Sequence, residues 1–340
     1  MHTPSLINFE TEWSYQYLPK MKSPEELKYL FEIQLKPALV SLESLRKKLM
    51  SKYILYILGL LVSFAIPFFF GQQMHALMYV GMGGSLLFIF LLIMLNGQKK
   101  AYRAEFKQKV VKEIVHLINA DWNYQPDGRI SEMDYRKSDL FETHYDRYKG
   151  DDRVFGSIEK TDFEFSELHT EYKTTTTKDG KTEEHWHTIF KGIFAHADFN
   201  KEIKGKTLVL PDTAEKLFGG FGKKLQSMSS RGKLIKMENV EFEKMFVVYG
   251  SDQIESRYIL TPTMMEALVN IRKTYGKNVY FSFIGSRVYF AISFNKDLFE
   301  PRIFKSGVRF EDVQQMNDQI NIIQTLVHEL NLNTRIWTKN

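Results

Sequence analysis

One short segment carries side chains that could bind a metal ion. In KTEEHWHT, residues 181–188, the residues Glu183, His185 and His187 alternate along the chain. If this segment is a β-strand, all three side chains lie on one face, and carboxylate and imidazole groups are common ligands of zinc and iron. No fourth ligand is evident, so we favour an exposed polar face. We predict no metal, no cofactor and no catalytic residue, and these three residues are the metal candidates to test.

The surrounding elements predict how these side chains are placed. Residues 178–181, Lys-Asp-Gly-Lys, are typical of a two-residue turn between two antiparallel strands. With that turn, residues whose numbers sum to 359 face each other across the hairpin. Tyr172 is then opposite His187, and Thr174 is opposite His185. The histidines are thereby expected on an exposed hairpin.

Three other groups of residues suggest chemistry, and each has a simpler structural interpretation. GGFGKK at 219–224 lacks the spacing of a phosphate-binding loop and falls at the end of a predicted helix. Ser166, Glu167 and His169 are too close along one strand to form a catalytic triad without a further partner. A set of carboxylates fits a strand that alternates charged and apolar residues: Glu238, Glu241, Glu243, Asp252 and Glu255.

The composition excludes several classes of protein and site. The formal net charge is only +5 over 340 residues, which is too little to argue for nucleic acid binding. The chain has no cysteine, so disulfides, thiolate nucleophiles and cysteine-ligated metal centres are excluded. A chain without cysteine fits a reducing compartment.

Two charge-free apolar stretches lie at residues 53–70 and 76–95. A helix rises about 1.5 Å per residue, so each stretch spans roughly 27–30 Å, the thickness of a bilayer core. The short connection at residues 71–75 forces the two helices to run antiparallel. We therefore predict a transmembrane helical hairpin at residues 53–95, with both outer ends on the same side of the membrane.

Basic residues flank both outer ends of this hairpin, and its connecting loop has none. The positive-inside rule therefore places both termini in the cytoplasm, in a multi-pass arrangement. The same side chains could contact anionic lipid headgroups, although orientation alone would explain them. The residues in question are Arg46, Lys47, Lys48, Lys99 and Lys100.

Helices are predicted to continue the hairpin on both sides. Residues 1–52 are expected to contain a cytoplasmic amphipathic helix that starts near Ser23 and bends at Pro37. Residues 96–124 are expected to form a juxtamembrane helix. Inside the hairpin, small residues predict a close approach of the two helices: Gly59, Ser63, Gly81 and Ser85.

Residues 125–340 alternate between strand-like and helical patterns, so the predicted fold class is α+β. We expect a transmembrane hairpin followed by a cytoplasmic domain with a mixed antiparallel sheet and helices. NVYFSFIG and RVYFAISF predict a further β-hairpin around Gly285-Ser286. One apolar stripe predicts a long C-terminal helix: Val313, Met316, Ile320, Ile323, Val327 and Leu330.

Several segments together resemble a known family. They are SDLF (138–141), FSELH (165–169), FKGIFAHADFNK (190–201), MENVEFEKMFVVYGSDQIESRYILTP (237–262), FSF (281–283) and LFEP (298–301). Over about residues 138–301 the chain is similar to the bacterial domain-of-unknown-function family 3137. The resemblance implies a bacterial, membrane-associated protein, and hence the inner (cytoplasmic) membrane. It brings no established activity and no catalytic residues.

The sequence favours a cytoplasmic interaction or scaffold domain that is anchored in the lipid bilayer and is not an enzyme. Such a domain would recruit an unknown protein partner or respond to the membrane surface, and it would not bind nucleic acid. The alternative is a membrane-tethered hydrolase or metal-dependent enzyme that uses the strand with His185 and His187. A compact pocket joining these histidines to a carboxylate would favour the enzyme, and a flat aromatic sheet face would favour the interaction domain.

Overall fold

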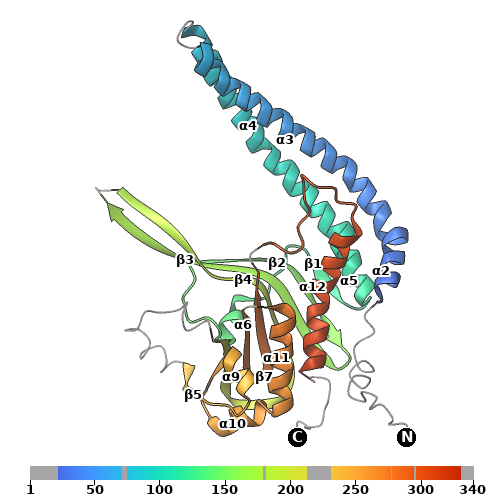
Figure 1. Ribbon diagram of the computed structural model, residues 1–340, viewed down its shortest axis with the longest axis vertical. Helices are drawn as coiled ribbons and strands as arrows, with labels where there is room; N and C mark the ends of the chain where they lie inside the picture. The colour runs from blue at the N-terminus through green and yellow to red at the C-terminus, as the bar shows by residue number, and fades with distance from the viewer. Residues whose placement is uncertain are drawn as a thin grey trace, which may run out of the picture. The chain divides into compact units, whose positions relative to one another are not determined.

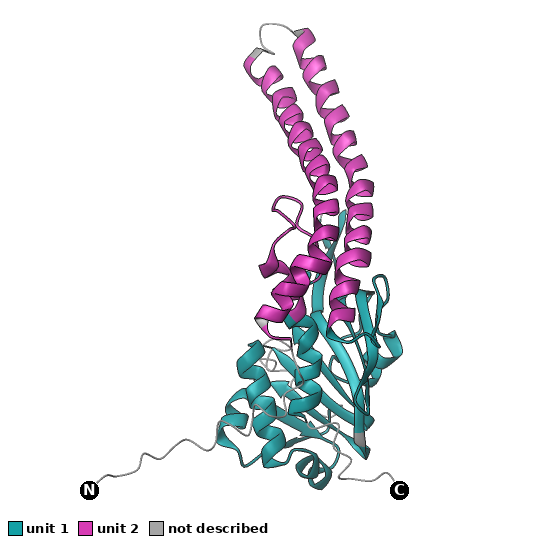
Figure 2. Cartoon of the chain, turned by 90° about the vertical axis from the view of Figure 1, so that its right-hand side faces the viewer, with its two compact units in different colours: residues 1–21, 118–298, 318–340 teal, residues 22–117, 299–317 magenta. Residues whose placement is uncertain are grey.

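The chain consists of two compact units (Figure 2). We call residues 22–117 with 299–317 the helical unit, and residues 118–298 with 318–330 the α+β unit. The glycine-rich segment at 219–224 and the turn residues Asp179-Gly180 lie outside the described residues. The computed structural model describes residues 22–70, 75–178, 181–212, 231–276, 278–294 and 296–330.

The helical unit begins with a capped helix. Ser23 caps α2 (Pro24–Leu30): its hydroxyl accepts a hydrogen bond from the backbone nitrogen of Glu26 at 3.1 Å, and the Glu26 carboxylate accepts one from the Ser23 nitrogen. The π-helical turn η1 (Phe31–Leu35) then leads into α3 (Lys36–Phe70), so the irregularity precedes Pro37. Helical spacing predicts an apolar stripe of eight residues here, and six of them are buried: Leu27, Phe31, Leu35, Leu39, Leu42 and Leu49. Leu30 is half-buried, and Leu45 is exposed.

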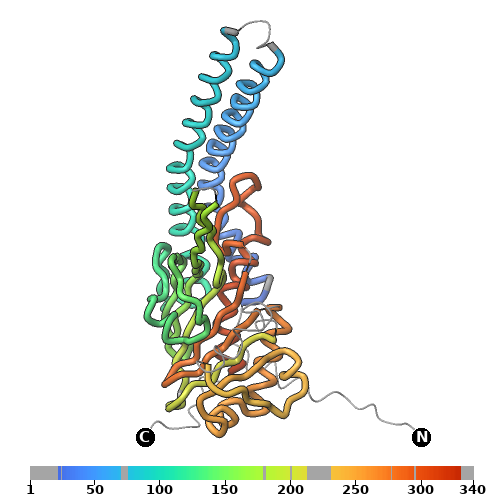
Figure 3. The backbone as a smooth tube through the Cα atoms, turned by 90° about the vertical axis from the view of Figure 1, so that its left-hand side faces the viewer, coloured from blue at the N-terminus to red at the C-terminus, as the bar shows by residue number. Residues whose placement is uncertain are grey.

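A second long helix pairs with α3. α4 (His75–Phe106) continues through the π-helical turn η2 (Lys107–Val111) into α5 (Lys112–Ile118). α3 and α4 lie side by side and run in opposite directions (Figure 3). Both are long enough and apolar enough to cross a membrane, judged by length and composition.

Small residues let α3 and α4 approach closely. A Cβ atom at Gly59 would overlap the ring of Phe88, and one at Gly84 would lie 2.6 Å from the hydroxyl oxygen of Ser63. Ser63 is buried and donates a hydrogen bond back to the carbonyl of Gly59 at 2.8 Å. The close approach predicted from small residues is therefore confirmed.

Among the described residues, seven strands form one antiparallel sheet in the α+β unit (Figure 1). Their order is β1-β2-β3-β4-β6-β5, and β7 also pairs with β4. Their bounds are β1 (Asn123–Gln125), β2 (Arg147–Ile158), β3 (Thr161–Lys178), β4 (Lys181–Pro211), β5 (Lys233–Ile235), β6 (Phe246–Gly250) and β7 (Val279–Ser293).

The sheet is assembled on β4, whose 31 residues pair with β3, β6 and β7. β7 is one continuous strand, so the hairpin predicted around Gly285-Ser286 is wrong. Arg287 lies opposite Asp198, and Phe283 lies opposite Thr207 further along the same strand. Gly285 has a φ of 60° at the shift in register between these two parts. The sequence pattern misleads because a glycine with positive φ serves an irregular strand as well as a turn.

Helices and an aromatic core complete the α+β unit. The ring of Tyr135 stacks on Phe141 at 5.4 Å and lies 5.3 Å from the ring of Phe194 in the sheet. The predicted α+β class is confirmed, as is the C-terminal helix, whose apolar stripe is buried. The helix bounds are α6 (Glu132–Lys137), α9 (Val240–Met245), α10 (Gln253–Ile259), α11 (Pro262–Tyr275) and α12 (Phe310–Glu329).

Candidate functional site

β3 and β4 extend beyond the rest of the sheet as a two-stranded projection (Figure 1). β2 stops pairing with β3 where Arg147 lies opposite Glu171. From there to the turn, residues 171–178 pair with residues 181–188, and no third described strand joins them. We call these two segments the β3–β4 arm. No described strand pairs with the outer edge of residues 181–188, whereas on the β3 side Asp146 accepts a hydrogen bond from the backbone nitrogen of Lys173 at 2.7 Å.

Glu183, His185 and His187 lie on this arm in the register predicted from the turn. Tyr172 is opposite His187, and Thr174 is opposite His185. His187 Nε2 lies 2.8 Å from Thr174 Oγ1, and the His187 ring stacks on Tyr172 with centroids 4.8 Å apart. His185 Nε2 lies 4.0 Å from Glu183 Oε2, with both side chains exposed. The cross-strand neighbours thus engage His187, and the three residues do not form a cluster with metal-ligand spacing.

The other face of the arm carries a stacked cation. The guanidinium carbon of Arg147 lies 3.5 Å from the centroid of the Trp186 ring, and Arg147 Nη1 donates to Glu171 at 2.9 Å. Beside them, Lys173 Nζ donates to Glu184 at 2.8 Å. Trp186 remains 37% exposed. A rigid aromatic ring beside an arginine is the composition that binding hot spots favour.

Ser166 lies on the opposite face of β3 from Glu167 and His169. Ser166 Oγ accepts a hydrogen bond from the backbone nitrogen of Ile130 at 3.1 Å. His169 Nε2 lies 3.1 Å from Thr188 Oγ1. Successive side chains of a strand alternate between its two faces, so buried Glu167 is on the face opposite Ser166. The three residues make no triad, as their spacing predicts.

The alternating strand predicted for the carboxylates between residues 238 and 255 is wrong, because Glu241 and Glu243 lie on α9 and Glu255 lies on α10. These carboxylates serve local structure. Asp252 caps α10 by accepting from the backbone nitrogen of Ile254 at 2.7 Å. Glu255 accepts from the backbone nitrogens of Lys204 and Gly205 at 2.8 and 2.9 Å. The remaining three have partners of their own: Glu238 with Arg257, Glu241 with Lys273, and Glu243 with the backbone nitrogen of Met237.

A polar pocket of about 490 Å³ lies over strands β2, β3, β4 and β7. The strand register creates it. Phe155 is opposite Glu164, Glu164 is opposite His196, and Asp198 is opposite Arg287. These residues belong to two neighbouring rows on one face of the sheet, so side chains from distant parts of the chain line one depression.

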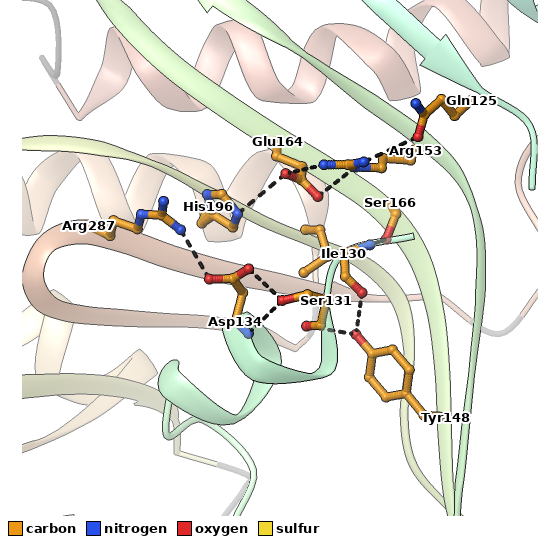
Figure 4. A network of polar contacts seen from close by, with 10 residues as sticks. All are labelled: Gln125, Ile130, Ser131, Asp134, Tyr148, Arg153, Glu164, Ser166, His196 and Arg287. Carbon is orange, nitrogen blue, oxygen red and sulfur yellow. Dashed lines mark hydrogen bonds and ion pairs between the residues drawn. The ribbon is translucent and has the colours of Figure 1, made fainter. Parts of the chain in front are cut away.

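Two ion pairs frame this pocket (Figure 4). Arg153 donates two hydrogen bonds to Glu164, at 2.8 and 2.9 Å, and this contact raises the pKa of Arg153. Arg287 donates to Asp134 at 3.1 Å, and Asp134 also accepts from the hydroxyl of Ser131 at 2.6 Å. The paired charges fix the walls of the pocket.

His196 lies between the two pairs and is 8% exposed. Its Nε2 is buried without a hydrogen-bond partner among the described residues, and Glu164 Oε2 lies 3.8 Å away. Burial lowers the pKa of His196, and the nearby Arg287 lowers it further. The imidazole is therefore neutral at pH 7.

A second cluster joins Asp151, Asp152 and Glu167, each of which has a carboxylate oxygen within 4.8 Å of the others. Asp152 lies in a β-bulge with a φ of 55° and accepts a hydrogen bond from the Tyr124 hydroxyl at 2.5 Å. Burial raises the pKa of Glu167 to about 8, and the charges of both aspartates add to the shift. These oxygens are the ligand type that hard divalent cations prefer. Three ionised carboxylates this close would repel one another, and either a bound cation or a proton retained on Glu167 would reduce that repulsion.

Sequence reasoning misses both sites, for different reasons. The two-residue turn at Glu159-Lys160 could have revealed the carboxylate cluster, because it places Ile158 opposite Thr161 and so sets the pairing of β2 with β3. No local sequence pattern predicts the pocket. Glu164, His196 and Arg287 meet only through the pairing of β4 with both β3 and β7.

Comparisons with known proteins find similarity to a family over part of the chain and no activity. Residues 188–332 match the family described as "Protein of unknown function (DUF3137)", which confirms the family resemblance. No curated protein matches the chain. A solved structure similar to the chain is that of the mycobacterial trehalose monomycolate transport factor A, TtfA. It shares 8% identity with a TM-score of 0.30, over 62% of this chain and 92% of that chain.

Proposed function

We propose that this chain with a DUF3137 region is a membrane-anchored interaction protein. The helical hairpin would hold it in the bacterial inner membrane with both termini in the cytoplasm, and the α+β unit would bind a protein partner. The observation that carries the interaction role is the β3–β4 arm, which projects from the sheet, has no described strand on the outer edge of residues 181–188, and exposes Trp186.

The outward faces of α3 and α4 support the anchor. Monomeric soluble proteins rarely expose contiguous apolar patches larger than a few hundred Å². Here large apolar side chains are exposed along most of both charge-free stretches, which is favourable in lipid and costly in water. Exposed examples are Leu55, Leu58, Leu61, Val62, Phe64, Tyr79, Val80, Met82, Leu86, Phe90 and Ile93.

The basic residues at the ends of these stretches support the orientation and a contact with anionic headgroups. Lys47, Lys48, Lys99 and Lys100 are exposed. Arg46 differs: it is 4% exposed and donates to Glu43 at 2.7 and 2.8 Å. The lipid contact that we propose therefore involves the four lysines and not Arg46.

Reporter fusions test the orientation directly. A reporter that is active only in the periplasm should be active when fused at Gln72 and inactive when fused at Asn340. Carbonate washing should leave the full-length chain in the membrane pellet. The opposite pair of reporter signals would contradict the topology, and release by carbonate would contradict the anchor.

The arm favours a protein partner because of its backbone and its anchor residue. Each outer edge of a two-stranded ribbon presents unpaired N–H and C=O groups, which an extended segment of another protein can pair with as an added strand. On the β4 edge, Trp186 stacks with Arg147, and the pair supplies apolar area and charge. Nucleic acid recognition would need a broad basic face, and here Glu171 and Glu184 balance Arg147 and Lys173.

Photocrosslinking in living cells tests this role. A photoreactive phenylalanine analogue at Trp186 should give a discrete crosslinked adduct. The matched control is Tyr258, another exposed aromatic residue, whose ring lies 4.6 Å from Lys201 Nζ; the same analogue there should give none. Trp186→Ala should weaken co-purification of the adduct's protein, whereas Tyr258→Ala should not. Equal crosslinking at both positions would contradict binding through the arm.

A further inference from the structure

Residues 299–317, which we call the strap, belong to the same unit as the long helices and lie beside them (Figure 3). The strap includes the first residues of α12. Near the start of the strap, Glu300 pairs with Lys107 on η2 at 3.3 Å. Arg46 on α3 then donates to the backbone carbonyl of Ile303 at 2.5 Å. The first contact of the strap with α3 is therefore made by the buried Arg46, which holds the strap backbone at Ile303.

The strap turns back after Phe304. The ring of Phe304 meets the ring of Tyr53 edge-on, with centroids 5.9 Å apart. The backbone nitrogen of Gly307 then donates to Glu43 at 3.2 Å, earlier on α3 than Arg46. Arg46 and the Gly307 nitrogen together lower the pKa of Glu43. Phe304 is therefore the apex of the strap.

The apex lies level with the ends of both apolar stretches. Tyr53 is the first residue of the stretch 53–70. The preceding residue, Lys52, donates to Gln98 at 2.9 Å, and Gln98 lies just past the end of the stretch 76–95. Where α3 and α4 change from charged to apolar, the strap presents its aromatic residue.

The packing of the strap does not account for the exposed side chain of Phe304. Its side chain is 63% exposed, although the neighbouring residue Ile303 is buried and held through its carbonyl. Lys305 beside it is also exposed. A single exposed aromatic residue is ordinary. An aromatic residue next to a cation, at the end of a membrane-spanning stretch, is the arrangement that the lipid–water interface favours.

We propose that the apex of the strap inserts Phe304 into the headgroup region of the bilayer, as a third membrane contact beside α3 and α4. The inference rests on the proposed membrane hairpin and goes beyond it, because it assigns a lipid contact to a segment far away in the sequence. The occupant is the lipid surface, since the ring is continuous with the apolar surface that begins at Tyr53.

Depth-dependent quenching tests the insertion. The natural chain has no cysteine, so Phe304→Cys in the full chain can carry one fluorophore. The labelled protein is reconstituted into phosphatidylcholine–phosphatidylglycerol vesicles whose lipids bear a nitroxide high or low on the acyl chain. We expect the shallow nitroxide to quench the label more strongly than the deep one. Lys305→Cys, at an exposed neighbouring position, should show the same order and guards against a local effect of the first substitution.

Two further single-cysteine variants separate the possible failures. Leu61→Cys, exposed within the first apolar stretch, should be quenched best by the deep nitroxide. Tyr29→Cys, exposed on α2 and about 36 Å along the helix from Tyr53, should not be quenched. If the Phe304 and Lys305 labels behave like that at Tyr29 while Leu61 is quenched, insertion of the strap is overturned. If Leu61 is not quenched either, the membrane hairpin itself fails.

Discussion

The carboxylate of Glu167 accepts a 3.0 Å hydrogen bond from the backbone nitrogen of Leu298, a residue 131 positions later, and both residues are buried. The bond ties the segment after β7 to the middle of β3. It also favours the charged form of Glu167, against burial and the nearby aspartates. Burial dominates, so the pKa of Glu167 rises to about 8.

This shift predicts a stability that falls as the pH rises. The unfolded chain loses the Glu167 proton near pH 4.5 and the folded chain near pH 8. Between these values the folded state binds the extra proton, so the free energy of unfolding should fall by about 1.4 kcal/mol per pH unit. Glu167→Gln keeps an acceptor for Leu298 and should remove this slope. Urea unfolding of the detergent-solubilised chain from pH 4.5 to 8.5 measures it.

The control for this prediction is Glu238→Gln, which changes a carboxylate that is 90% exposed. It should leave the pH dependence of the wild-type chain unchanged. Parallel pH profiles for the wild type and Glu167→Gln would mean that Glu167 is ionised in the folded protein.

A second prediction concerns the histidines of the arm. Changing His185 and His187 together to alanine should cost less than about 1 kcal/mol of unfolding free energy, because both lie on an exposed ribbon. Elemental analysis of the purified protein should find no stoichiometric zinc or iron. A bound metal that disappears in the double variant would instead support the metal-dependent enzyme.

A third prediction concerns where the α+β unit begins. We expect a fragment starting at Gln125 to fold cooperatively but to be less stable than one starting at Ile118. Only the longer fragment keeps Trp122, whose Nε1 donates to the carbonyl of Ser157 at 3.1 Å and whose ring lies 4.7 Å from that of Phe163. Deleting a buried tryptophan side chain costs about 3–5 kcal/mol. Thermal unfolding of both fragments measures the difference, and Trp122→Ala in the longer fragment should reproduce most of it.

A fourth prediction uses two glycines of the long helices. Gly59→Leu should destabilise the helix pair by roughly 1–3 kcal/mol, because its side chain would collide with Phe88. Gly83→Leu is the matched control, because nothing lies within 4 Å of a Cβ there. Thermal unfolding in detergent should separate the two variants. Equal melting temperatures for the two variants would show that α3 and α4 are not in close contact at Gly59.

The sequence predicts local geometry better than long-range geometry. The two-residue turn places Tyr172 opposite His187 because such a turn leaves only one register. The register set by this turn holds as far as Glu171. Between Glu171 and Thr170 the pairing of β3 with β4 shifts by one residue. The polar pocket lies beyond this shift and depends on the pairing of β4 with β3 and β7, which no local turn sets there.

The same distinction holds for the apolar patterns. Helical spacing is sufficient to predict the buried stripes of α3 and α12, since a helix fixes which residues share a face. Gly285 shows the limit of such rules. A positive φ at glycine fits a turn or an irregular strand, and the choice is made by β4, which lies many residues away.

β4 also has a mechanical consequence. One unbroken strand runs from Thr182, near the tip of the arm, through His196 in the polar pocket to Pro211, which pairs with Phe246 of β6. A pull on the tip along this strand would load the hydrogen bonds to β3, β6 and β7 in shear, many at once, instead of opening them one by one. Tension on the arm would thus be carried along β4 into the part of the sheet that pairs with β6 and β7.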